Sequence, residues 1–151
     1  MKHFSMKELE CKCGRCHMTP EVIDNLNALT DRVLDPLRSR YGNPIYVNSG
    51  YRCLNHNKAV GGVANSQHCK GQAADITAGS PEENLKLARL IIEGRDWDQM
   101  ILYVPNANTL KPQFLHVTWK ADGANRRKIY KKVLGGAPIY TPLSPADIMN
   151  H

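Results

Sequence analysis

Residues 114–119 read Phe-Leu-His-Val-Thr-Trp, an alternation of side chains that is typical of a β-strand with one face in the core. Successive side chains of a strand point to opposite faces, so Leu115, Val117 and Trp119 are expected on the core side. His116 then points away from the core, on the other face of the strand. The stretch predicts a core strand that presents one imidazole on its opposite face.

A second stretch, residues 66–76, reads Ser-Gln-His-Cys-Lys-Gly-Gln-Ala-Ala-Asp-Ile and carries another histidine and a carboxylate. Its second half predicts a strand around Asp75, and its glycine suits a turn after His68. Two imidazoles and one carboxylate, from His68, Asp75 and His116, form a three-ligand set that leaves a zinc ion one open position for water. Such a site would support metal-assisted hydrolysis. Taken singly, each histidine has the alternative of a surface or core residue, and the aspartate that of a turn cap.

Three phrases in the same order carry a resemblance to a known family. They are Ser-Gly-Tyr-Arg at 49–52, Ser-x-His and Gly-x-Ala-Ala-Asp-Ile within 66–76, and Leu-His-Val at 115–117. Together they resemble the zinc D-Ala-D-Ala carboxypeptidase family, which includes phage endolysin-type peptidoglycan peptidases and shares its core fold with the Hedgehog signalling domain. The resemblance extends from about residue 4 to about residue 128. It implies a zinc peptidase that cuts peptide bonds in bacterial cell-wall stem peptides.

The resemblance also implies roles for individual residues. His68, Asp75 and His116 fall on the family's zinc ligands, Arg52 on its substrate-binding arginine, and Ser66 on a substrate-contacting serine. The chemistry of the arginine agrees, because a guanidinium can grip a carboxylate through two hydrogen bonds. An ordinary surface arginine is the alternative for that position.

One position departs from the family pattern. Many members carry Glu or Asp as general base three residues before the last histidine ligand, and this chain has Gln113 there. A neutral amide cannot accept a proton from zinc-bound water. Asp98, which starts a strand-like run, is then the leading candidate for the base, with a turn residue after Trp97 as its alternative. Otherwise zinc hydroxide suffices while Gln113 orients the nucleophile or the oxyanion, or the protein binds without cutting.

The chain has five cysteines, an odd count that argues against a closed disulfide framework. Cys11, Cys13 and Cys16 have a knuckle-like spacing that would hold a second, structural zinc through thiolates. The alternative is a reduced, partly buried cysteine cluster in a cytosolic protein. Cys53 and Cys69 flank the phrases above. Two interpretations are open: both are small apolar side chains that fill space, or the two lie near each other in the fold.

Length and composition bound the class of protein. With 151 residues we expect one domain, residues 1–151, with a core at about 4–134, and we expect a monomer. The hydrophobic fraction of 42% and charged fraction of 23% suit a globular protein, and no apolar run approaches the ~20 residues of a membrane span. No signal peptide is visible in the first residues. Given the resemblance, we expect synthesis in the cytoplasm and action on the cell wall after release by another route, as for a phage lysin.

The net charge is +6, with a basic cluster at residues 126–132. A solvated charged face is the favoured interpretation, and encounter with acidic wall polymers or binding to nucleic acid are the others. Aromatic residues that would stack on bases are sparse there, Tyr130 apart. Nucleic acid is therefore not an expected partner.

Periodicity and capping signals predict the order of elements as an α+β domain with a mostly antiparallel sheet and flanking helices. A helix begins at Pro20, and Pro36 should kink or split it. The other expected elements are a strand at 45–48, helices at 54–60 and 80–93, a hairpin of strands at 100–104 and 113–119, a short helix or turn at 123–134 and a coil tail at 135–151.

The favoured function is therefore a zinc metallopeptidase acting on peptidoglycan peptides, as a D-Ala-D-Ala carboxypeptidase or as an endopeptidase. A non-catalytic, zinc-containing module that binds muropeptides or a protein is the alternative, and Gln113 is its best support.

Overall fold

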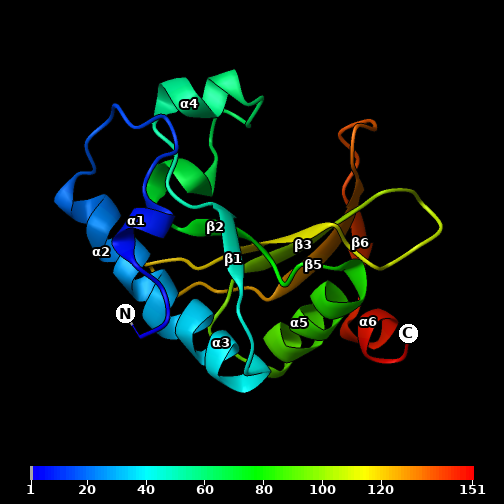
Figure 1. Ribbon diagram of the computed structural model, residues 1–151. Helices are drawn as coiled ribbons and strands as arrows, with labels where there is room; N and C mark the ends of the chain where they lie inside the picture. The colour runs from blue at the N-terminus through cyan, green and yellow to red at the C-terminus, as the bar shows by residue number, and fades with distance from the viewer. Residues whose placement is uncertain (1) are drawn as a thin grey trace.

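A six-stranded sheet organises residues 2–151, the part of the chain that the structure, a computed structural model, describes (Figure 1). The strands lie in the order β1-β2-β4-β3-β5-β6. All neighbouring pairs are antiparallel except β3 and β5, which are parallel. The predicted α+β fold with a mostly antiparallel sheet is thus confirmed. The strands are β1 (Tyr46–Ser49), β2 (Ala73–Thr77), β3 (Gln99–Val104), β4 (Phe114–Thr118), β5 (Lys128–Val133) and β6 (Thr141–Leu143).

Helices flank this sheet. Figure 1 shows α2, α3 and α5 together below the sheet and α4 on the opposite side of the view. The helices are α1 (Met6–Leu9), α2 (Pro20–Leu29), the π-helical segment η1 (Thr30–Leu34), α3 (Asp35–Tyr41), α4 (Leu54–Ala59), the 3-10 helix η2 (Gln67–Lys70), α5 (Pro81–Glu93) and α6 (Pro145–Met149). No helix within residues 2–151 combines the length and the apolar character that a bilayer span needs.

The first long helical stretch begins as expected and changes its helix type before Pro36. The Thr19 hydroxyl accepts the N–H of Val22, and Pro20 occupies the first turn of α2. Pro36 has no N–H to donate, and the turn just before it is the wider π-helical segment η1. The predicted kink or split at Pro36 therefore takes the form of a change in helix type between α2 and α3.

Strand β4 follows the alternation of its sequence. Leu115 and Val117 are fully buried in the core, together with Leu102 of β3 and Leu87 of α5. This apolar side of β4 fixes the orientation of the strand, so His116 is presented on the other face.

Two expectations for the C-terminal part were wrong. Residues 123–134 are not a helix or turn: they contain β5, which pairs in parallel with β3. Residues 135–151 are not a coil tail, because β6 pairs with β5, and α6 places Ile148 in the core with no exposed surface. The missed signal is a capping box, in which Ser144 and Asp147 each accept a hydrogen bond from the other's backbone N–H at the start of α6.

Candidate metal centre and its pocket

Three separate elements bring two histidines and an aspartate to one place. His68 lies on η2, Asp75 in β2 and His116 in β4. Asp75 and His116 are direct partners in the antiparallel register between β2 and β4, so their side chains project side by side from one face of the sheet. The 3-10 turn of η2 places His68 against this pair.

The ligating atoms of these residues have the spacing of a metal site. His116 Nδ1 is 2.8 Å from Asp75 Oδ1, and His68 Nε2 is 3.2 Å from both of these atoms. Ligands about 2.0–2.1 Å from a tetrahedral zinc are separated by roughly 3.3 Å. Zinc therefore fits the donor set and its spacing, and three protein ligands leave one coordination position open.

His68 is oriented for ligation by the backbone. Its side chain is 3% exposed, and Nδ1 lies 2.6 Å from the carbonyl oxygen of Gly50. A carbonyl only accepts, so Nδ1 carries the proton and the lone pair of Nε2 faces Asp75 and His116. Burial lowers the pKa of His68. The imidazole is thus held neutral, the form that binds a metal.

Asp75 remains a carboxylate although it is buried. Burial alone would raise its pKa, but the hydrogen bond from His116 and the close contact with His68 hold the pKa well below its usual range. The guanidinium of Arg52 also lies 3.3 Å from Asp75 Oδ2. One carboxylate oxygen therefore faces the two imidazoles, and the other faces Arg52.

The cluster lies in the wall of an open cavity of about 480 Å³. This size suits a peptide fragment, since small-molecule sites span ~300–1,000 Å³. Besides the three clustered residues, the polar and aromatic side chains that line it include Arg52, Ser66, Gln99, Tyr103, Lys132 and Tyr140.

The structure brings the two predicted substrate-binding residues to this cavity. Arg52 is held by Ser49 at 3.0 Å and by Asn57 at 3.0 Å in addition to Asp75. Its guanidinium is therefore fixed in place at the cavity wall. Ser66 is buried, lines the same cavity, and accepts the backbone N–H of His68 through its hydroxyl oxygen.

The structure does not bring Asp98, the candidate base, or Gln113, the candidate for orienting the nucleophile or the oxyanion, to the cavity. Asp98 lies immediately before β3 and is fully buried, and its oxygens accept hydrogen bonds from Arg126 at 2.9, 3.0 and 3.1 Å. Its carboxylate is the partner of a structural ion pair. Gln113 is exposed just before β4, and its backbone is hydrogen-bonded to Tyr103 and Asn84. Because it precedes His116 by an odd number of positions, alternation along the strand directs the two side chains to opposite faces. Neither residue lines the cavity.

Sequence reasoning missed the aromatic wall of this cavity. Tyr103 of β3 stacks on Phe114 of β4 with ring centroids 4.6 Å apart, and Lys132 of β5 lies 6.0 Å from the Tyr103 ring. Burial raises the pKa of Tyr103, and Tyr140 and Asp75 add to this effect. The phenol therefore stays protonated and able to donate a hydrogen bond. Tyr103 alternates along β3 with Gln99 and Ile101, which also line the cavity, so the side-chain alternation of the strand was the available signal for it. Tyr140 comes from the segment expected to be coil.

The cysteines and the basic cluster lie elsewhere. Cys11, Cys13 and Cys16 do meet, and Cys53 joins them, while Cys69 is outside this group. Within the basic cluster Arg126 is bound to Asp98, and Lys131 donates to a backbone carbonyl.

Two imidazoles and a carboxylate at the wall of an open cavity form a candidate site for one metal ion. The sequence profile of the peptidase M15 family matches residues 2–107, and the chain belongs to this family. The match includes Arg52, His68 and Asp75; His116 lies beyond it and joins the site through the register of β4. The family expected from the sequence phrases is confirmed.

A curated relative agrees with this assignment. The chain is 48% identical over 48 residues to the zinc D-Ala-D-Ala carboxypeptidase of Streptomyces albus G. These residues are 31% of this chain and 19% of the relative, so the match spans about a fifth of the relative's length.

Proposed function

We propose that this protein is a zinc-dependent peptidase that hydrolyses peptide bonds in peptidoglycan stem peptides. The observation that carries the proposal is the convergence of His68 Nε2, Asp75 Oδ1 and His116 Nδ1 within 3.2 Å of one another, beside a cavity that also holds Arg52. Family membership and the name of the curated relative support it.

Zinc held by these three residues would polarise the scissile carbonyl and lower the pKa of a bound water to ~7, which makes that water a nucleophile at neutral pH. The protein side chains around the zinc would supply its ligands. His68 and His116 contribute nitrogen donors, and Asp75 contributes the only carboxylate among the described residues that line the cavity. A separate carboxylate base is thus not part of the proposed mechanism.

Arg52 would bind the substrate. Its guanidinium has a fixed position and faces the cavity beside Asp75, and stem peptides carry carboxylates that a guanidinium can grip. Ser66 lies next to His68 on the same wall and would contact the peptide backbone.

Tyr103 would stabilise the transition state. Its phenol is protonated and its ring is fixed against Phe114, so its hydroxyl would donate to the oxyanion that develops on the carbonyl. Lys132 adds positive charge to the same wall.

The test is hydrolysis of purified peptidoglycan by the purified protein, followed as release of D-alanine and of new amino groups. Release of D-alanine alone indicates a carboxypeptidase, and new amino groups within the stem indicate an endopeptidase. Activity should vanish on chelation and return with zinc. A His68→Ala, Asp75→Ala double variant should be inactive, and the exposed His151→Ala should retain activity. Full activity in the double variant would rule out the proposal.

A non-catalytic zinc module remains the second candidate, because within residues 2–151 no carboxylate other than Asp75 lines the cavity. It predicts zinc-dependent binding of muropeptides without turnover. Turnover that chelation abolishes and zinc restores would dismiss it.

A further inference from the structure

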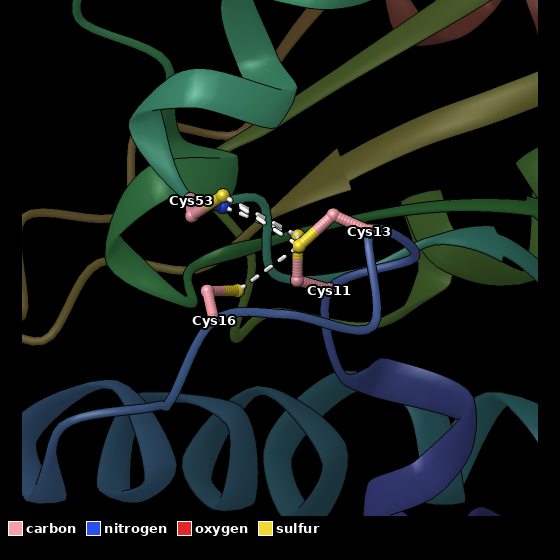
Figure 2. A group of neighbouring side chains, drawn as sticks. All are labelled: Cys11, Cys13, Cys16 and Cys53. Carbon is pink, nitrogen blue, oxygen red and sulfur yellow. Dashed lines mark hydrogen bonds between the residues drawn. The ribbon is translucent and has the colours of Figure 1, made fainter.

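Four cysteines from two distant parts of the chain meet beside the N-terminal segment (Figure 2). Cys11, Cys13 and Cys16 lie in the turn between α1 and α2, and Cys53 is the residue before α4. Figure 2 shows the four side chains pointing toward one another from these two segments. Cys11 is buried and the other three are partly exposed.

The sulfur atoms have the spacing of a tetrahedral metal site. The Sγ–Sγ distances are 3.3 Å for Cys11 and Cys13, 3.4 Å for Cys13 and Cys16, and 3.8 Å from Cys53 to both Cys11 and Cys13. Four sulfurs about 2.3 Å from one zinc ion are roughly 3.8 Å apart. A disulfide would need one pair at about 2.05 Å, and no pair within residues 2–151 is that close.

The backbone around the cluster is shaped for thiolate ligands. Gly14 has a φ of 67°, which lets the chain turn between Cys13 and Cys16. Backbone N–H groups donate to the sulfurs at 3.4 Å: Arg15 to Cys13, Cys53 to Cys11, and His56 to Cys53. Such donors stabilise the charge of metal-bound thiolates and fix their orientation.

We propose that Cys11, Cys13, Cys16 and Cys53 bind a second zinc ion through four thiolates, with a structural role. Four protein ligands fill the coordination sphere and leave no position for water, in contrast to the site at His68, Asp75 and His116. Each thiol that is protonated before binding releases its proton to solvent, and the cation removes the repulsion that four thiolates at this distance would have. A surface hollow lined by Cys13, Cys16 and Cys53 gives the ion a path from solvent.

The position of Cys53 gives this zinc a task in the fold. Cys53 follows Arg52 directly, and the preceding Tyr51 donates its N–H to the carbonyl of Leu9 at 2.8 Å. The zinc would therefore tie the N-terminal segment to the turn that carries Arg52 and the Gly50 carbonyl bound to His68. This role is independent of whether the proposed hydrolysis takes place.

The first experiment counts metal in purified protein prepared with zinc and a reductant. Wild-type protein should contain about two zinc ions per chain, and a Cys13→Ser, Cys16→Ser variant about one. The His68→Ala, Asp75→Ala variant should also retain about one, which separates this site from the catalytic proposal. Cys69→Ser, a cysteine outside the cluster, should keep both ions. An unchanged zinc count in the double-cysteine variant would overturn the proposal.

The second experiment covers the case in which the cysteine variant does not fold, because it uses wild-type protein and the double variant of His68 and Asp75. Substitution with Co²⁺ should give intense thiolate-to-metal charge-transfer absorption, and the double variant should retain it. Alkylation should modify Cys69 alone in the metal-loaded protein and all five cysteines after chelation. Absence of the charge-transfer band, or fewer than five free thiols after unfolding without reductant, would overturn the proposal.

Discussion

The Nδ1 atom of His68 lies 2.6 Å from the carbonyl oxygen of Gly50, so the turn that follows β1 orients the imidazole that η2 contributes to the candidate metal centre. Gly50 itself is confined: a Cβ at this position would lie 2.5 Å from the backbone oxygen of Leu9. The N-terminal segment, the Arg52 turn and the candidate metal centre are therefore packed as one unit. A substitution in one of them should change the structure of the others.

Gly50→Ala should weaken zinc binding at the metal centre. The added methyl group would push the turn away from Leu9 and move the carbonyl that holds His68. Loss of such an outer partner typically costs ~10–100-fold in metal affinity. Competition with a chromophoric chelator measures the affinity. Gly136→Ala is the control, because its Cβ would meet only ordinary contacts; equal affinity in both variants would contradict the expected effect.

Arg52→Lys should raise KM more than it lowers kcat. Lysine keeps the positive charge but cannot make two parallel hydrogen bonds to a carboxylate, so KM should rise roughly 10- to 100-fold. Steady-state kinetics on a stem-peptide substrate gives the two constants separately, and the zinc content should be checked because Arg52 also contacts Asp75. The exposed Arg32→Lys should change neither constant. A loss confined to kcat would show that Arg52 acts in the chemical step instead.

Tyr103→Phe should lower kcat on the order of 10²-fold with little change in KM, as expected for one lost oxyanion donor. Phenylalanine preserves the stacking on Phe114, so the cavity wall should keep its shape. The comparison variant is Tyr46→Phe, an exposed tyrosine on β1. If kcat is unchanged in Tyr103→Phe, the donor to the oxyanion is another group.

Asp98→Asn should reduce stability without removing activity. Burial would raise the pKa of Asp98, but its hydrogen bonds from Arg126 outweigh this and lower the pKa. The carboxylate thus contributes stability that is fully present above its ordinary pKa of 3.8 and is lost as the pH falls through the lower value of the folded protein. The variant should be ~1–3 kcal/mol less stable at neutral pH. Its free energy of unfolding should also fall less steeply below about pH 4.

Urea unfolding with a chelator present measures this without interference from acid release of zinc. Turnover of the zinc-loaded variant, assayed where it is folded, is the second readout. Loss of turnover with normal zinc content would support Asp98 as the general base, contrary to its position outside the cavity.

The convergence of His68, Asp75 and His116 could be predicted from sequence because local rules place these residues. The alternation of residues 114–119 decides which face of β4 carries His116, and the strand around Asp75 needs only the antiparallel register to lie opposite it. Arg52 and Ser66 followed from the resemblance, and the structure places both at the cavity.

Residues whose roles depend on pairing between distant segments could not be predicted in the same way. Cys53 is separated from Cys11 by 42 positions, and no local pattern relates them. Tyr103 reaches the cavity through its pairing with Phe114, and β5 through its parallel pairing with β3. The sequence of β5, Lys-Ile-Tyr-Lys-Lys-Val, is rich in charge, and Ile129 is its one buried residue. It therefore lacks the alternation that would have predicted a strand.

Ile148→Ala should destabilise the protein by ~2–5 kcal/mol, the usual cost of truncating a large buried aliphatic side chain. The neighbouring Met149→Ala should change the free energy of unfolding by at most ~0.5 kcal/mol, because Met149 is 40% exposed whereas Ile148 has no exposed surface. Chemical unfolding of both variants makes the comparison at adjacent positions of α6. A coil tail predicts equal, small effects, whereas a helix packed on α5 predicts a large difference. Tyr140 lines the cavity and directly precedes β6, in the same C-terminal segment as α6, so the Ile148 variant should also raise KM for stem peptides.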